Sequence, residues 1–169
     1  MKIRTGGPQD VAAVLRMFDS AVAWLSAQGR TGQWGSEPFT GDPKRTAQVE
    51  GWAESDGMRI AEIDGSPAGC VTVGPPNAYV PAAPVPELYV QALVIDQAFA
   101  GHKVGRALLD WSLEEAVRRG AQVLRVDCYA GDDERLVGYY ESCGFTREAP
   151  FAVGQWPGMI LQRSLSALR

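Results

Sequence analysis

The chain has 169 residues, of which 46% are hydrophobic and 21% are charged, with a formal net charge of −4. This length and composition predict a single compact domain over residues 1–169, which can bury a core without disulfides or metal. A net negative charge provides no broad basic surface for duplex nucleic acid, so we expect no nucleic-acid partner. A short local loop can still bind phosphate.

The cysteine and histidine content argues against a structural metal site. Cys70, Cys128 and Cys143 have no CxxC spacing, and His102 is the only histidine in the sequence. The N-terminal segment lacks a signal-peptide pattern, and no apolar run approaches the roughly 18 residues that a membrane span needs. We therefore expect a cytoplasmic protein, with no membrane or metal partner, that is a monomer or a homodimer.

The N-terminal half predicts a strand at 2–4 and a helix from Pro8 to about Gln28, because apolar residues recur there at three- and four-residue steps. A loop follows, in which we interpret Trp34 and Phe39 as core aromatics. A second helix is expected from about residue 42 to 53. The turn signal Asp64-Gly65 between segments 59–63 and 68–73 predicts a β-hairpin.

Residues 74–86 contain prolines at 75, 76, 81, 84 and 86. Proline excludes a central strand or a helix, so this segment predicts a long surface loop within the same domain. The remaining elements are expected to alternate: strand 88–95, helix 105–119, strand 123–129, helix 134–142, and strands near 145–153 and 159–165. The predicted order is β-α-α-β-β-β-α-β-α-β-β, of the α/β (α+β) class.

The first informative block runs from Leu93 to Asp110, where a buried strand leads through a short loop into an amphipathic helix. The first turn of such a helix presents unpaired N–H groups and the positive end of the helix dipole, which together suit a phosphate. Gly105 would let the backbone approach the anion closely, although a glycine needed only for packing gives the same pattern. The nucleotide motifs GxxxxGK[ST] and GxGxxG are both absent.

The second block spans residues 132–145. Acidic residues begin a short helix that Gly144 ends, and Tyr139 and Tyr140 fall on neighbouring faces of that helix. We expect at most one of the two tyrosines to lie in the core. A tyrosine on such a helix is more often a packed residue than a catalytic acid.

Taken together, the two blocks resemble the GNAT N-acetyltransferase superfamily, and the resemblance covers residues 2–165. The family's loop pattern, Arg/Gln-x-x-Gly-x-Gly/Ala, falls on Ala100, Lys103 and Gly105, where only the glycine agrees. The family's second pattern, Asn-x-x-Ala-x-x-x-Tyr-x-x-x-Gly-Phe, keeps its last three residues and falls on Asp133, Leu136, Tyr140, Gly144 and Phe145.

The resemblance implies a central, mixed, mostly antiparallel twisted sheet with helices on both faces and splayed central strands. It implies acetyl-CoA as cosubstrate and the direct attack of a primary amine of a small molecule or peptide on the thioester. It assigns cofactor binding to Leu93, Val94, Ile95, Ala100, Gly101, His102, Lys103, Val104, Gly105, Arg106, Asp133 and Leu136. Because the family's pyrophosphate contacts are mainly to main-chain N–H groups, Ala100 and Lys103 can still supply them.

For the reaction itself, the resemblance makes Tyr140 the general acid and the Val94 N–H the donor to the oxyanion. Glu87 could accept the amine proton, or could be a solvated carboxylate at the end of a strand, and Asp127 is a second candidate base. Neither Cys128 nor Cys143 has a visible partner that would activate it as an acyl carrier, so we expect both to be small core residues. A non-catalytic acyl-CoA-binding or regulatory module on the same fold is the alternative function.

Overall fold

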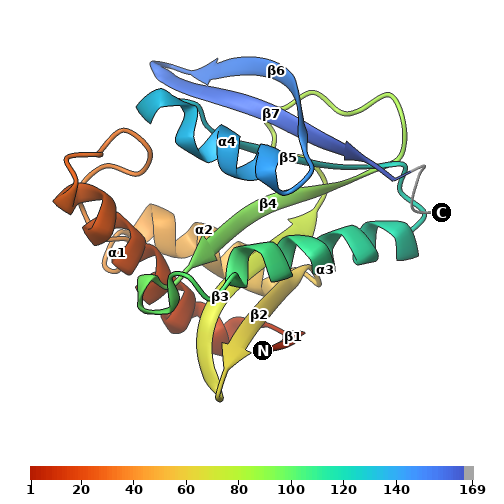
Figure 1. Ribbon diagram of the computed structural model, residues 1–169. Coiled ribbons are helices and arrows are strands. Elements are labelled where there is room, and N and C mark those ends of the chain that lie inside the picture. The colour runs from red at the N-terminus through yellow and green to blue at the C-terminus, as the bar shows by residue number, and fades with distance from the viewer. Residues whose placement is uncertain (166–169) are drawn as a thin grey trace. The chain divides into compact units, whose positions relative to one another are not determined.

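The structure is a computed structural model and describes residues 1–165 (Figure 1). The helices and strands in chain order are β1 (Lys2–Thr5), α1 (Val11–Ala27), α2 (Pro43–Glu54), β2 (Met58–Ile63), β3 (Ser66–Gly74), β4 (Glu87–Ile95), α3 (Val104–Arg118), β5 (Val123–Tyr129), α4 (Arg135–Ser142), β6 (Thr146–Val153) and β7 (Trp156–Ser164). Three 3₁₀ helices within the described residues, η1 (Pro8–Asp10), η2 (Gln97–Phe99) and η3 (Asp132–Glu134), complete the chain.

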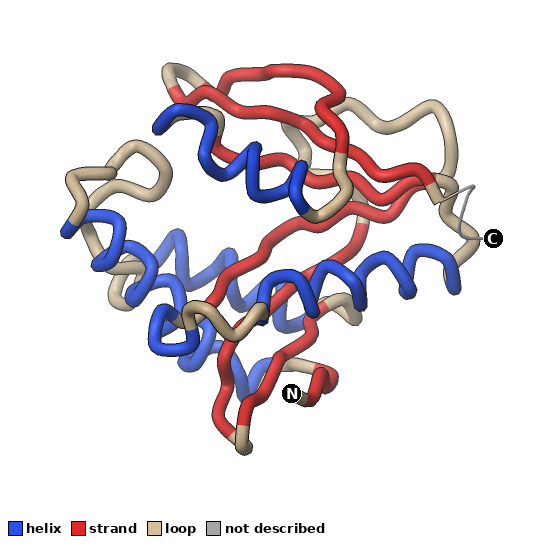
Figure 2. Tube along the Cα trace, in the orientation of Figure 1, coloured by secondary structure: helices blue, strands red, loops and turns tan. Residues whose placement is uncertain are grey.

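The strands of residues 1–165 are hydrogen-bonded in the order β1-β2-β3-β4-β5-β7-β6 (Figure 2). The pairs β1–β2, β2–β3, β5–β7 and β6–β7 are antiparallel, whereas β4 and β5 are parallel. The predicted mixed and mostly antiparallel sheet is therefore confirmed. The β4–β5 register runs from Glu87↔Val123 to Val90↔Val126, although β5 itself continues to Tyr129.

The chain divides into two compact units, which are described separately below. Unit 1 contains residues 1–72 and 92–108. Unit 2 contains residues 73–91 and 109–169, of which those up to 165 are described. None of the helices in the described part of the chain is long and apolar enough to cross a membrane.

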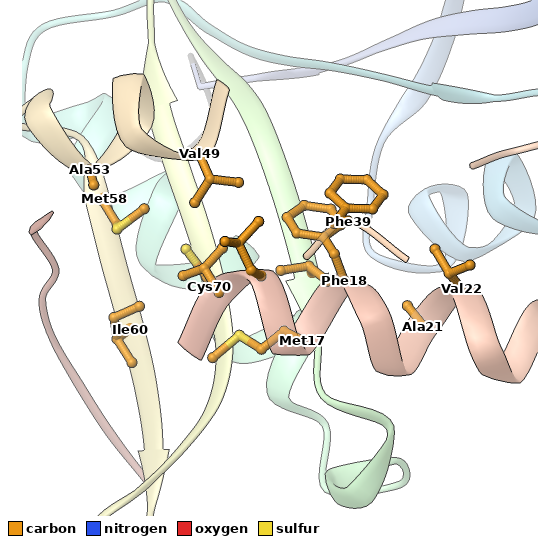
Figure 3. Packing of buried hydrophobic residues seen from close by; sticks show 13 residues of the cluster. Met17, Phe18, Ala21, Val22, Phe39, Val49, Ala53, Met58, Ile60 and Cys70 are labelled. Carbon is orange, nitrogen blue, oxygen red and sulfur yellow. The ribbon is translucent and has the colours of Figure 1, made fainter. Parts of the chain in front are cut away.

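In unit 1, α1 and α2 lay their apolar sides on β2 and β3 (Figure 3). The ring of Phe18 stacks on that of Phe39, with centroids 4.4 Å apart, and meets Trp34 edge-on at 5.3 Å. The predicted core role of Trp34 and Phe39 is therefore confirmed. Cys70 on β3 faces this cluster, while the adjacent Gly69 faces Val104 and Leu108 of α3, so helices cover both faces of this strand.

The helix boundaries in unit 1 follow from local chemistry. The Asp42 side chain accepts hydrogen bonds from the N–H groups of Lys44 and Arg45, and Pro43 occupies the first turn, so α2 begins where it was predicted. Gly29 takes a positive φ of 72° just beyond α1. The predicted start at Pro8 was wrong by one turn, because residues 8–10 form η1 and α1 begins at Val11.

In unit 2, a buried arginine joins the proline-rich segment to the strands. Arg125 on β5 is 2% exposed and donates to Glu87 on β4 and to Glu148 on β6, at distances of 2.9 and 2.7 Å. The same guanidinium donates to the carbonyl oxygen of Pro81 at 3.0 Å. Residues 75–86 thus form the predicted loop, but side-chain contacts fix that loop in place.

Candidate active site

The loop between β4 and α3 is built by a cap and two left-handed residues. Asp96 accepts a hydrogen bond from the Ala98 N–H at 2.9 Å and so begins η2, a turn that the sequence did not predict. Gly101 and Lys103 take positive φ angles of 85° and 59°. The Lys103 carbonyl oxygen accepts from the Ala107 N–H at 3.1 Å, so α3 starts immediately after Lys103.

Side-chain packing fixes the first turn of α3, and the N–H groups of that turn have no acceptor within the helix. Val104 is 2% exposed, and its side chain with that of Leu108 fills the space beside Gly69, where a Cβ would lie 2.7 Å from Val104 Cγ1. The N–H groups of Val104 and Gly105 belong to the first turn, in which no helical carbonyl can accept from them. Ala100, Gly101, His102 and Lys103 are exposed in front of this turn.

This arrangement fits a phosphate group of a cofactor. The amides are main-chain donors, and the helix dipole places partial positive charge at the same point. Gly105 is buried at the second position of the helix, and the exposed Arg106 follows it. The fit does not depend on the side chains of Ala100 and Lys103, the two positions that depart from the family pattern.

Leu93, Val94 and Ile95 also belong to unit 1 and form the end of β4. Val94 is 3% exposed and belongs to the core cluster of that unit, while Leu93 and Ile95 are half-buried. After Ile95 the Asp96 N–H donates to the carbonyl oxygen of Ala68 at 2.9 Å, which ties the strand end to β3.

The remaining candidates lie in unit 2, where α4 carries the two tyrosines. Tyr140 is 5% exposed and packs edge-on against the rings of Tyr139 and Phe145, at 5.4 and 5.8 Å. Tyr139 is 37% exposed. The prediction that only one of the two enters the core is therefore confirmed, and that one is Tyr140.

The Tyr140 phenol lies in an apolar setting close to other acidic groups. Burial raises its pKa well above the usual value, and the neighbouring Cys128, Tyr139 and Asp127 raise it further. No hydrogen bond to its hydroxyl is formed by the residues that the structure describes. The hydroxyl thus stays protonated and can donate to a group from outside the chain.

Glu87 is engaged on both carboxylate oxygens. Its Oε1 accepts from Arg125 at 2.9 Å and its Oε2 accepts from the Ala83 N–H at 2.6 Å. The Glu87 side chain is 9% exposed. This setting favours a structural role, since a proton on Glu87 would weaken the buried ion pair.

Asp127 on β5 has a different environment, made of neutral donors. Its Oδ2 accepts from the Tyr89 hydroxyl at 2.5 Å and from the Asn77 amide nitrogen at 3.2 Å. Its Oδ1 accepts from the Tyr79 hydroxyl at 3.2 Å. Burial and the Asp127 charge raise the pKa of both tyrosines, so they remain donors.

The sequence did not single out Asn77 and Tyr79, which lie in the predicted surface loop 74–86, or Tyr89, which lies in the predicted strand 88–95. One available signal was the single acidic residue in the apolar strand Val123–Tyr129, since a carboxylate there needs donors. The donors themselves come from 38 to 50 positions away in the sequence, a separation that local patterns cannot bridge.

Asp133 and Leu136 lie where α4 begins, and here one prediction was wrong. Asp132, Asp133 and Glu134 take positive φ angles of 54°, 60° and 57°, so they form a left-handed turn instead of the first turn of a helix. α4 begins at Arg135, and Leu136 is half-buried in its first turn.

The three cysteines are buried and free, which confirms the prediction that Cys128 and Cys143 are small core residues. Burial raises the pKa of both Cys70 and Cys128 to about 12. A thiol with that pKa is almost entirely protonated near neutral pH and is a poor nucleophile.

Comparisons with known proteins agree with this geometry. The profile of the acetyltransferase (GNAT) family matches residues 22–145. The chain is 29% identical over 142 residues to a mycothiol acetyltransferase from Rhodococcus erythropolis, a match that covers 83% of this chain. The same match covers 44% of that protein, so the chain spans less than half the length of this relative.

Solved structures give the same fold over nearly the whole chain. A ribosomal-protein-alanine N-acetyltransferase from Brucella melitensis superposes with a TM-score of 0.70 at 21% identity, over 98% of this chain and 100% of that one. A protein from Salmonella typhimurium, solved with its cofactor acetyl-CoA, gives a TM-score of 0.69 at 21% identity, over 98% and 94% of the two chains. At these identities the likeness shows the fold alone.

Proposed function

The chain belongs to the acetyltransferase (GNAT) family, and on that premise we propose that it transfers the acetyl group of acetyl-CoA to a primary amine. The nitrogen of the neutral amine attacks the thioester carbonyl, a C–N bond forms and the C–S bond breaks. The amine loses one proton and the sulfur of coenzyme A gains one. The products are an N-acetylated amine and the free thiol.

One observation supports acetyl-CoA most directly, namely the start of α3. The amides of Val104 and Gly105 lie in a first helical turn, behind a loop that Gly101 and Lys103 bend through left-handed conformations. A diphosphate would accept from these amides and gain from the helix dipole. In this proposal the positions from Ala100 to Arg106 bind the pyrophosphate through the main chain.

The same proposal gives roles to individual groups around the reacting atoms. The Val94 N–H donates to the oxygen of the tetrahedral intermediate, and Leu93 and Ile95 pair with the pantetheine arm. Tyr140 donates its proton to the leaving sulfur, a role that is supported by its hydroxyl, to which no described residue forms a hydrogen bond. Asp133 and Leu136 stay proposed as contacts for the cofactor.

For the base, the structure favours one of the two candidates over the other. Glu87 stays a prediction, but its charge is bound to Arg125. Asp127 has no salt bridge to a lysine or arginine within residues 1–165, so it can accept a proton from an incoming ammonium without breaking an ion pair. We therefore propose Asp127 as the group that receives the amine proton, directly or through water.

Three further statements, on domain organisation, cellular location and acceptor class, complete the proposal. Units 1 and 2 form a single domain of residues 1–169, as the near-complete coverage by single solved chains supports. The protein acts in the cytoplasm, as a monomer or a homodimer. Its acceptor is a small molecule or a peptide, and the name of the mycothiol acetyltransferase is not carried over, because the match covers 44% of that protein.

The test combines binding and turnover. Calorimetry with acetyl-CoA is expected to show one site per chain and a higher melting temperature at saturating ligand. An assay that detects the released thiol, run with a panel of primary amines, is expected to show amine-dependent turnover. Binding without turnover for any amine would favour the non-catalytic module, and a protein that does not bind acetyl-CoA would overturn the proposal.

A further inference from the structure

The carboxylate of Asp127 is partly buried, yet it forms no salt bridge with any lysine or arginine that the structure describes. Its partners, Tyr79, Tyr89 and Asn77, are all neutral donors, and no salt bridge reaches it within residues 1–165. A carboxylate can accept about four hydrogen bonds. Oδ2 accepts from Tyr89 and Asn77, whereas the closest donor to Oδ1 is the Tyr79 hydroxyl, so Oδ1 retains capacity for a further donor.

The charges around Asp127 favour a cation from outside the chain. The Arg125 guanidinium lies 5.8 Å from the centroid of the Tyr89 ring, but it is already bound to Glu87 and Glu148. This part of unit 2 therefore holds three carboxylates and one guanidinium, which pairs with Glu87 and Glu148 but not with Asp127. The resulting local potential is negative, which attracts an ammonium group and repels a second carboxylate.

Next to this carboxylate lies a row of aromatic rings in the same unit. Tyr79, which binds Asp127 through its hydroxyl, is 51% exposed and stacks on Phe151 with centroids 5.6 Å apart. Phe151 continues to Trp156 at 6.2 Å, and Trp156 to Tyr129 at 5.5 Å. Tyr129 stands two positions after Asp127 on β5, so the two side chains leave the same face of that strand.

A purely structural role does not account for all of these features. Asp127 does fix the proline-rich loop through Asn77 and Tyr79. The three donors account for two acceptor oxygens at this position, because an amide would offer only one. They do not account for the charge, which no lysine or arginine within residues 1–165 neutralises through a salt bridge. Phe151 helps to hold the loop, because it stacks on Tyr79 and packs against the cluster that contains Val80, but the Tyr79 ring stays 51% exposed beside Asp127.

We propose that Asp127 binds the ammonium form of the acceptor, and that Tyr79 and Phe151 bind a flat apolar group attached to it. The inference rests on the proposed function and narrows its acceptor to a class. The acceptor is a primary amine that carries an aromatic or similarly flat group and has no carboxylate beside the nitrogen. An α-amino acid is a poor acceptor, because its carboxylate would meet Asp127 without a cation to pair with.

Two probes that differ by one carboxylate test this assignment, namely phenethylamine and phenylalanine. Their binding to the whole chain, in the presence of coenzyme A, is measured at neutral pH by the chemical-shift changes of backbone amides on titration. We expect phenethylamine to bind at least about 10-fold more tightly, since a charge-assisted hydrogen bond in a partly buried site contributes about 1.5 to 3 kcal/mol.

Asp127→Asn keeps the shape of the side chain and removes its charge. The variant is expected to bind phenethylamine about 10- to 100-fold more weakly, and to lose the preference over phenylalanine. Asp56→Asn, at an exposed position in unit 1, is the matched control and is expected to keep both affinities. If Asp127 only fixed the proline-rich loop, Asp127→Asn would lower the affinities for phenethylamine and phenylalanine equally. That result would overturn the inference.

Phe151→Leu tests the aromatic contact without touching the carboxylate, and remains informative if Asp127→Asn does not fold. Phenethylamine affinity is expected to fall several-fold while that of n-butylamine stays unchanged. If both amines lose affinity equally, the flat-group part of the inference is wrong. If the parent chain binds phenylalanine as well as phenethylamine, the whole inference is wrong.

The turnover assay separates this inference from the proposed function. Transfer of the acetyl group to amines, together with equal binding of the two probes, would retain the function and reject the Asp127 site. A preference for phenethylamine that depends on Asp127, in a chain that transfers no acetyl group, would retain the site and reject the function.

Discussion

The two units present their candidate chemistry in different ways. In unit 1 the groups proposed to bind phosphate are main-chain amides at the start of α3, positioned by backbone angles and by the packing of Val104 and Leu108. In unit 2 the groups are side chains, Tyr140 and Asp127, each with its own hydrogen-bonding and packing environment. Main-chain recognition tolerates many sequences, whereas side-chain chemistry requires a particular residue at each position.

This difference explains how one chain can depart from the family pattern at Ala100 and Lys103 and still keep the family's tyrosine at Tyr140. Substitutions that preserve the bend before α3 should have small effects on cofactor binding. Substitutions that remove one functional group in unit 2 should have large effects. Four predictions test this contrast, in order of decreasing expected effect.

Tyr140→Phe is expected to lower kcat by about 10²- to 10⁴-fold, with a much smaller change in the KM for acetyl-CoA, because a general acid typically contributes this much. The measurement is steady-state kinetics on an amine for which chemistry is shown to be rate-limiting. Tyr139→Phe, on the more exposed neighbour, is the control and should leave kcat nearly unchanged. Equal turnover in Tyr140→Phe and the parent would make Tyr140 a packing residue.

Arg125→Met removes the cation that pairs with two carboxylates in the interior of unit 2. Breaking a buried pair leaves an uncompensated charge, so the free energy of unfolding should fall by about 3 to 5 kcal/mol. Arg147→Met is the matched comparison, because Arg147 also bridges two glutamates, Glu134 and Glu141, but its side chain is 42% exposed. That variant should lose at most about 1 kcal/mol in urea denaturation.

If the two arginine variants lose the same stability, burial does not distinguish these networks. The fold of the proline-rich loop would then depend less on Arg125 than is indicated by the hydrogen bonds that Arg125 donates to Glu87 and Pro81.

Gly105→Glu places a side chain and a negative charge where the diphosphate is proposed to approach the backbone. The Kd for coenzyme A should rise by about 100-fold, which corresponds to about 2.7 kcal/mol, the range expected for lost hydrogen bonds to a charged group. Gly51→Glu is the control, since Gly51 lies in α2 and a Cβ added there would meet no atom within 4 Å. Circular dichroism verifies the fold of both variants.

A folded Gly105→Glu chain that binds coenzyme A as tightly as the parent would show that Gly105 serves packing alone. The proposal that main-chain amides at the start of α3 bind the diphosphate would then lose its main support.

Lys103→Gly should change the Kd for coenzyme A by less than about 5-fold. Glycine adopts the φ of 59° at this position without strain, and a single exposed charge near a helix end contributes about 0.3 to 1 kcal/mol. A loss of 100-fold in the same calorimetric titration would show that the lysine side chain, instead of the main chain, binds the phosphate.

The order of the helices and strands was predictable, because hydrophobic periodicity and turn residues act locally. Asp64-Gly65 predicted the hairpin of β2 and β3, and Gly29 marked the end of α1. Local rules failed at residues 132–134, where an acidic run suggested a helix start. Aspartate tolerates left-handed angles better than most residues, so the same composition is also compatible with the turn that forms.

The site was predictable only in part, for a similar reason. Tyr140 stands out because its spacing to Gly144 and Phe145 is local. The partners of Glu87 and Asp127 depend on the register of β4 beside β5 and on where the proline-rich loop folds back. Only tertiary structure shows that Arg125 binds Glu87 while Asp127 receives neutral donors.

The five prolines between residues 74 and 86 have a kinetic consequence for the proposed acceptor. Proline restricts the unfolded chain, so this loop loses less conformational entropy when it becomes ordered than a glycine-rich loop of the same length. Its tethers at Asn77, Tyr79, Pro81 and Ala83 then hold it before any ligand arrives. An amine that meets Tyr79 therefore encounters a preorganised surface, and its association rate should not be limited by ordering of the loop.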